Sequence, residues 1–194
     1  LARRFAAEGM AVTVVTGDKD LMQIVDERIR LLDTMKDQVV GLEEVAERFG
    51  GTPDKVVEVQ ALVAAATTPQ PRRSVQGLEA ARIHQLLAVL ERHAGLSFAG
   101  KDVYVGVVGG IRLREPGADL PVALAVVSSL LDRPTGPLAA WGEVGLTGEV
   151  RAVAHHDRRA EEVGRLGIDR VVAPAGNGDD RIEKALAAAG LLGD

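Results

Sequence analysis

The sequence contains no cysteine, and only 3% of its 194 residues are aromatic. The lack of cysteine excludes disulfides and thiolate metal sites and fits a reducing compartment. Valine, leucine and alanine must therefore supply the core, and an apolar fraction of 46% is enough to form one. No apolar run reaches transmembrane length, and no signal-peptide pattern opens the chain. We expect a cytoplasmic protein with no membrane partner.

The sequence also lacks an excess of positive charge. The net charge is −5, of which −3 falls in residues 1–56 and −2 in the remainder. A protein that binds nucleic acid through its overall field usually carries a strong basic excess. Any contact with DNA would therefore need a local cluster of arginine or lysine.

The most informative stretch runs from Asp102 to Arg151. It starts with a strand-like alternating run over 102–108 and continues, after a Gly-Gly pair, as a helix over 118–131 that is apolar on nearly every side. A helix without a polar face must be covered on all sides, so we expect it at the centre of a layered domain. A glycine-punctuated hairpin over 142–150 closes the stretch.

The first quarter of the chain predicts a β-α-β unit. The runs over 11–15 and 28–32 predict two strands, and the helix between them opens at Asp18 and Asp20. Ligands of such units usually lie beyond the carboxyl ends of the strands, where these two carboxylates could share a divalent metal. Alternatively, Asp18 caps the helix and Asp20 favours its positive end. The spacing alone leaves both interpretations open.

The motif T-G-D-K-D-L at 16–21, followed by the run over 29–36, resembles the five-prime nuclease domain of bacterial DNA polymerase I, a PIN-like fold. The resemblance implies that Asp18 and Asp20 help to bind the Mg²⁺ ions that cut DNA flaps. That family's remaining acidic residues are expected upstream of Leu1, and its glycine-rich DNA-gripping motif does not follow Val57. Because Mg²⁺ demands near-octahedral ligands, two carboxylates should hold it poorly. We expect residues 1–56 to be a nuclease fragment without activity.

Residues 57–194 predict a two-layer α+β domain. Amphipathic spacing with Ile83, Leu86 and Leu90 on one side predicts a helix over 79–93, with Arg82, Gln85 and Arg92 toward solvent. The prolines between residues 64 and 73 predict a loop there. The other predicted elements are strands over 56–63 and 170–174, and helices over 155–166 and 180–191.

Several motifs in this domain carry a second resemblance. They are E-V-Q-A-L-V at 58–63, P-R-R at 71–73, D-V-Y-V at 102–105, D-R-P at 132–134 and G-E-V-G-L-T-G-E-V-R at 142–151. Together they resemble the carboxy-terminal domain of the bacterial RadA, or Sms, family. The resemblance implies a Lon-protease-like fold related to the ribosomal protein S-five-like fold, and a role in DNA repair.

The resemblance to Lon raises the question of peptidase chemistry, which needs a serine nucleophile and a buried neutral lysine. Aligned with Lon, the serine position falls at Gly117 and the lysine position at Asp157, so neither reacting group is present. Ser128 and Ser129 more often bond back to helix carbonyls than act as nucleophiles. We expect Asp119, at a helix start, to be an ordinary cap.

Other possible centres of chemistry are equally incomplete. His155, His156 and Asp157 are adjacent on a predicted helix, so they point in different directions and suit a solvated helix start. There is no G-x-x-x-x-G-K-[ST] motif, so ATP could act only through an ATPase domain that this sequence lacks. The Gly109-Gly110 pair precedes no helix and predicts a tight turn.

The resulting expectation is a non-catalytic scaffold and oligomerisation module of a RadA-like DNA repair and recombination protein. The resemblance implies a homo-oligomer, a hexameric ring, and contact with branched or single-stranded DNA. Two other classes of function stay open, namely a metal-dependent five-prime nuclease and a Lon-like serine peptidase. The candidate DNA contacts are Arg72, Arg73, Arg112 and Arg114, whose guanidinium groups could neutralise phosphates. Alternatively, each of them is a solvated surface side chain.

Overall fold

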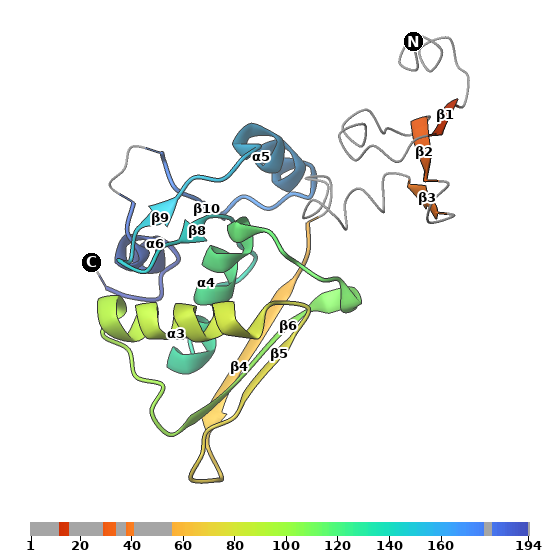
Figure 1. Ribbon diagram of the computed structural model, residues 1–194. Coiled ribbons are helices and arrows are strands. Elements are labelled where there is room, and N and C mark those ends of the chain that lie inside the picture. The colour runs from red at the N-terminus through yellow and green to blue at the C-terminus, as the bar shows by residue number, and fades with distance from the viewer. Residues whose placement is uncertain (1–11, 16–28, 34–37, 41–55, 177–179, 194) are drawn as a thin grey trace. The chain divides into compact units, whose positions relative to one another are not determined.

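The computed structural model describes residues 12–15, 29–33, 38–40, 56–176 and 180–193 (Figure 1). The chain forms two compact units, Leu1–Thr52 and Pro53–Asp194. Across the described ranges, no helix has both the length and the apolar composition that a membrane span requires. The predicted mixture of helices and strands is confirmed.

The first unit contains a three-stranded sheet in the order β1-β2-β3. Strand β1 (Val12–Val15) pairs in parallel with β2 (Ile29–Asp33), and β3 (Gln38–Val40) pairs antiparallel with β2. Both predicted runs therefore form strands, and their parallel pairing is what a β-α-β unit requires. Asp18, Asp20 and the helix predicted between the strands lie outside the described residues.

The second unit is built on a sheet in the order β4-β6-β5. Strand β4 (Val59–Ala65) runs antiparallel to β6 (Lys101–Val107), and β5 (Arg73–Gln76) runs parallel to it. The prediction of a loop over 64–73 was wrong at both ends. Alanines 64 and 65 continue β4, and Arg73 already begins β5, because the prolines interrupt only the connection between the two strands.

Two helices, α3 (Ala80–Ala94) and α4 (Asp119–Leu131), pack against the sheet (Figure 1). None of the thirteen residues of α4 is exposed, as expected for a helix without a polar face. Its Leu120 and Val127 are fully buried among side chains of α3 and the sheet. Removal of this apolar surface from water is the main stabilising contribution to the second unit.

The remainder of the second unit consists of short elements around a hairpin. They are β7 (Ala139–Ala140), β8 (Glu143–Val144), β9 (Val150–Arg151), α5 (His156–Arg165), β10 (Val171–Val172) and α6 (Ile182–Ala188). Strands β8 and β9 pair antiparallel, as predicted, whereas β7 pairs in parallel with β10. Helix α6 joins the main core, and α5 covers a separate small cluster of Ala139, Trp141 and Val163.

Candidate functional site

The structure fills the space beside Gly117, the position that corresponds to the Lon nucleophile. Gly117 is buried in a short 3-10 turn, Pro116–Ala118. A Cβ added there would lie 2.6 Å from Oε1 of Glu115 and 3.2 Å from Cγ2 of Val153. The Glu115 carboxylate is itself held by an ion pair with Arg159 of α5. A side chain at position 117 would therefore require the Glu115 carboxylate to shift.

The position that corresponds to the Lon lysine provides no buried amine. Asp157 lies exposed in the first turn of α5, where a carboxylate favours the positive end of the helix. The nearby Arg159 is bonded to the carbonyl of Ala154 and to Glu115. An arginine stays protonated in proteins, so it cannot accept a proton from a nucleophile.

The hydroxyl and imidazole groups considered from the sequence have structural partners. Ser128 Oγ donates to the carbonyl of Arg133 at 2.6 Å, and Ser129 Oγ accepts from the backbone N–H of Val63 at 2.9 Å. His156 Nδ1 accepts from Trp141 Nε1 at 3.2 Å. Ser129 therefore satisfies a backbone donor at the edge of β4, and His156 ties α5 to the buried tryptophan.

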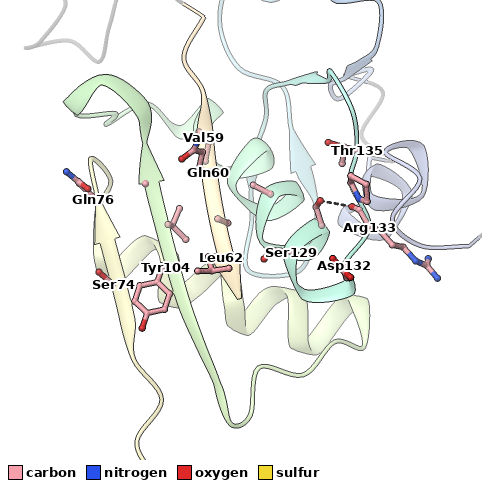
Figure 2. Close-up of a pocket in the computed structure, with 16 residues that line it drawn as sticks. Val59, Gln60, Leu62, Ser74, Gln76, Tyr104, Ser129, Asp132, Arg133 and Thr135 are labelled. Atoms are coloured by element: carbon pink, nitrogen blue, oxygen red, sulfur yellow. Dashed lines mark hydrogen bonds between the residues drawn. The ribbon is translucent and has the colours of Figure 1, made fainter. Parts of the chain in front are cut away.

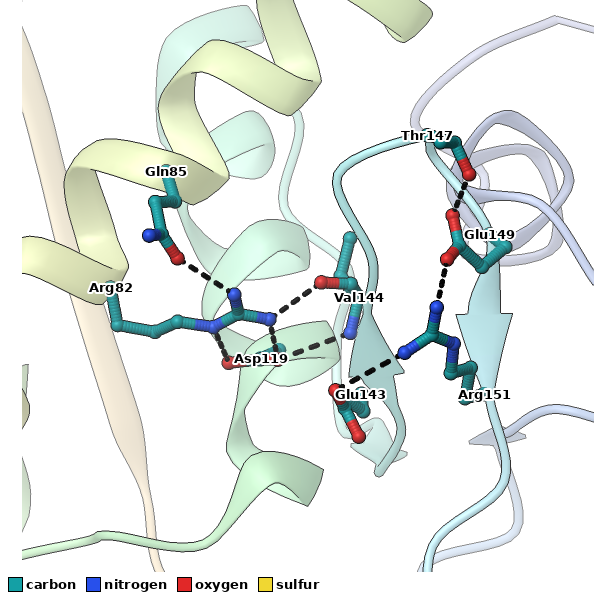
Figure 3. Close-up of polar contacts among 8 residues, drawn as sticks. All are labelled: Arg82, Gln85, Asp119, Glu143, Val144, Thr147, Glu149 and Arg151. Atoms are coloured by element: carbon teal, nitrogen blue, oxygen red, sulfur yellow. Dashed lines mark hydrogen bonds and ion pairs between the residues drawn. The ribbon is translucent and has the colours of Figure 1, made fainter.

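Asp119 does not cap helix α4, which corrects the sequence-based expectation. The N-cap residue is Ala118, and the start of α4 has no side-chain cap. Instead, the Asp119 carboxylate is buried and accepts from the Arg82 guanidinium and from the backbone N–H of Val144 (Figure 3). It thus joins α3, α4 and the β8–β9 hairpin.

The helical spacing predicted that Arg82 lies on the solvent side of α3, and this prediction was wrong. Its Nε donates to Asp119 at 2.9 Å, and its terminal nitrogens reach the carbonyl of Val144 and the side chain of Gln85 (Figure 3). The hydrogen bond with Asp119 raises the pKa of the Arg82 guanidinium above its ordinary value. The sequence could not show this because the partner is 37 positions away.

A second polar network stiffens the β8–β9 hairpin (Figure 3). Glu149 accepts from the Thr147 hydroxyl and from Arg151, and Arg151 also lies 3.7 Å from Glu143. The pKa of the Glu149 carboxyl is lowered to about 2, and the hydrogen bond from the Thr147 hydroxyl is the largest cause. The hydrogen bond with the backbone of Glu149 and the nearby Arg151 lower it further. These carboxylates therefore stabilise the hairpin.

The four candidate DNA-contacting arginines fall into two groups. Arg73 is half-buried, and its guanidinium donates to the carbonyls of Lys101 and Phe98, which fixes the start of β5. Arg72, Arg112 and Arg114 are exposed, and their guanidinium groups form no ion pair within the described part of the chain. The three exposed arginines are therefore available to an anionic partner.

A glycine turn and one backbone hydrogen bond position Arg112 and Arg114. Gly109 and Gly110 both have left-handed φ values, 84° and 72°, which confirms the predicted tight turn. The backbone N–H of Leu113 then donates to the carbonyl of Gly77 at 2.7 Å. Gly77 is itself left-handed, and a Cβ there would lie 2.5 Å from the carbonyl oxygen of Ile111. The segment that carries both arginines is thus tied to the end of β5.

The described ranges contain no group of three or more His, Asp or Glu side chains suited to a metal ion. The only candidate metal ligands from the sequence, Asp18 and Asp20, lie outside those ranges. The two carboxylates remain a prediction.

A groove of about 800 Å³ lies beside β4, between the sheet and the end of α4 (Figure 2). Its lining is mixed, with hydroxyl and amide groups such as those of Gln60, Ser74 and Thr135, apolar side chains, and the charged Asp132 and Arg133. Sequence reasoning missed the groove because it placed no strand at 73–76. With only four residues, that strand is too short to show a period of its own in the sequence.

The first unit matches a known protein family by sequence. Residues 1–50 match the model of the 5'-3' exonuclease, N-terminal resolvase-like domain. This match confirms the predicted resemblance of the first segment to five-prime nucleases.

The rest of the chain is similar to bacterial DNA repair proteins. These are RadA proteins, and that of Escherichia coli (strain K12) is 46% identical over 142 residues, which are 73% of this chain and 31% of that protein. RadA of Bacillus subtilis (strain 168) is 42% identical over 130 residues, 66% of this chain and 28% of that protein. RadA of Pseudomonas aeruginosa (strain PAO1) is 40% identical over 161 residues, which are 82% of this chain and 35% of that protein.

The chain thus spans about a third of the length of these RadA relatives. Because an alignment of 142 residues leaves 52 of the 194 unmatched, it includes at least residues 53–142 wherever it begins. That interval contains the whole β4-β6-β5 sheet with α3 and α4. The predicted resemblance to RadA is confirmed.

Proposed function

We propose that residues 57–194 are a non-catalytic scaffold that contacts DNA and joins copies of a RadA-like DNA repair and recombination protein. Residues 1–56 form the preceding nuclease-like domain. The observation that carries the proposal is the combination of RadA similarity with the Glu115–Arg159 ion pair beside Gly117. The packed helix α4 is present, but the positions of a serine–lysine pair hold a glycine and an exposed aspartate.

The DNA contact is proposed at Arg72, Arg112 and Arg114. Exposed guanidinium groups without a carboxylate partner can bind phosphates in a sequence-independent way. Arg73 supports this surface from within, because its guanidinium holds the start of β5 against the carbonyls of Lys101 and Phe98. The name of the relatives, DNA repair protein RadA, supports DNA as the anionic partner.

The nuclease-like domain is a second candidate for activity, favoured by the family match over residues 1–50. Cleavage would require Asp18 and Asp20 to hold Mg²⁺ between them and to activate a water molecule. Mg²⁺ demands near-octahedral oxygen ligands, which Asp18 and Asp20 do not supply by themselves. We propose that this domain retains the fold of a nuclease but does not cut DNA.

Two assays test the absence of catalysis. With Mg²⁺ or Mn²⁺, the chain should give no more product from a flapped DNA duplex than its Asp18→Ala variant. Casein should remain intact with both the wild type and Ser128→Ala, because the Ser128 hydroxyl is committed to the carbonyl of Arg133. Flap product lost in Asp18→Ala, or casein digestion lost in Ser128→Ala, would contradict the proposal.

A further inference from the structure

The sheet of the second unit has one covered and one open face. Val59, Ala61 and Val63 of β4 face the core beneath the sheet. Successive side chains of a strand point to opposite faces, so the alternate residues line the open face. They are Gln60 and Leu62 of β4, Tyr104 and Gly106 of β6, and Ser74 and Gln76 of β5. Two acidic residues share this phase, namely the buried Asp102 of β6 and the exposed Glu58, which precedes β4 by one position and accepts a hydrogen bond from Gln60 at 2.7 Å.

An aromatic ring lies at the centre of this open face (Figure 2). Tyr104 belongs to the central strand, directly between Leu62 on β4 and Ser74 on β5. Leu62 is 57% exposed and adds an apolar side chain beside the ring. Among the described aromatic residues, Phe98 and Trp141 are buried, so Tyr104 alone offers part of its ring to solvent.

A positive charge stands at one end of the same face. Arg72 precedes β5 by one position and is in phase with Ser74 and Gln76, so its side chain projects from the open face. The Asp102 carboxylate, its cross-strand neighbour, is buried and accepts the backbone N–H of Arg72 at 2.7 Å. The Arg72 guanidinium has no ion-pair partner in the described ranges.

The open face has the parts of a platform for single-stranded nucleic acid. These are an aromatic ring, amide and hydroxyl groups, and one arginine without an ion-pair partner. Bases of a single strand can stack on an aromatic ring, while an arginine neutralises the adjacent phosphate. A duplex keeps its bases stacked inside and cannot offer them to a flat sheet. The groove beside β4 leaves room next to Tyr104, and Gln60 and Thr135 are among the polar residues that line it (Figure 2).

We propose that the open face of the β4-β6-β5 sheet binds single-stranded DNA, with one base stacked on Tyr104 and a neighbouring phosphate bound by Arg72. This inference rests on the DNA contact proposed above and adds the strand type and the stacking residue. Leu62 and the aliphatic part of Gln60 flank the stacked base. Arg112 and Arg114, tied to the end of β5 through Gly77, extend the phosphate contacts beyond the platform.

The test is fluorescence anisotropy of a 5'-fluorescein oligothymidine strand titrated with the 194-residue chain. Tyr104→Leu should weaken binding roughly 5- to 150-fold, the range found when one stacking aromatic is removed. Tyr104→Phe keeps the ring and should bind like the wild type. Arg72→Ala should reduce the slope of log affinity against log salt by about 0.7, the value for one phosphate of a single strand.

The outcomes separate this inference from the broader proposal. If no DNA binds at low salt, both fail. If DNA binds but Tyr104→Leu and Arg72→Ala match the wild type, only the platform fails. If the chain binds the same sequence more tightly as a duplex, or binds an oligouridine strand more tightly, the assignment to single-stranded DNA is wrong.

Two controls exclude other causes of weaker binding. Circular dichroism melting must show that each variant is folded, and Leu62→Ala, already exposed, replaces Tyr104→Leu if the latter does not fold. Loss of the flanking leucine should then weaken binding to the strand. If Tyr104→Leu lowers the mass measured by light scattering without weakening binding, the face joins copies of the chain and the inference is wrong.

Discussion

Arg82→Ala is expected to lower the free energy of unfolding of the second unit by about 3–5 kcal/mol. The substitution leaves the Asp119 carboxylate, whose side chain is only 6% exposed, with the backbone N–H of Val144 as its remaining hydrogen-bond donor among the described residues. A buried charge that loses its partner is far more destabilising than a lost surface ion pair. The link between α3, α4 and the β8–β9 hairpin is lost at the same time.

Urea denaturation followed by circular dichroism measures this effect. Arg92→Ala is the matched control, because Arg92 lies exposed on the same helix and should change stability by less than about 0.5 kcal/mol. Arg82→Lys keeps the charge but not the paired hydrogen bonds, so its effect should fall between the two. An Arg82→Ala variant as stable as Arg92→Ala would show that the network contributes little.

The double substitution Arg112→Ala and Arg114→Ala is expected to weaken DNA binding most strongly at low salt. Each arginine that neutralises a phosphate of a single strand contributes about 0.7 to the slope of log affinity against log salt. The slope should therefore fall by about 1.4, which corresponds to roughly a sevenfold smaller loss of affinity between 50 and 200 mM salt.

Arg165→Ala provides the matched control for this pair. Arg165 is an exposed arginine of α5, and its partner Glu162 lies one helical turn away. Its loss changes the net charge without touching the proposed surface, so the slope should stay that of the wild type. Equal slopes for the double variant and the control would remove Arg112 and Arg114 from the DNA contact.

The elements with strong periodicity could be predicted from the sequence. The 3.6-residue spacing of α3 and the all-apolar composition of α4 placed both helices within one or two residues of their observed bounds. The alternating run that became β6 and the glycine hairpin were equally clear. In each case the local pattern and the tertiary environment favour the same structure.

Two short strands, β5 and β7, could not be predicted, because their stability comes from distant partners. Strand β5 has four residues and exists through its parallel pairing with β6. Strand β7 has two residues and depends on β10, about 30 positions later. Neither is long enough to show a period of its own.

The candidate sites show the same division between local and distant information. The absence of the reacting groups at Gly117 and Asp157 could be deduced from a motif comparison. The Glu115–Arg159 ion pair and the Arg82–Asp119 network could not, since their members lie 44 and 37 positions apart. Arg73 was grouped with Arg72 because adjacent arginines look alike in sequence, although alternation along β5 turns them to opposite faces.

The molar mass of the chain in solution tests the scaffold proposal most directly. Size-exclusion chromatography with light scattering at high micromolar concentration should give a multiple of 20.4 kDa, up to six copies for a closed ring. A module that joins copies of a repair protein must associate under these conditions. A mass of 20.4 kDa that does not change across the concentration range would contradict the account.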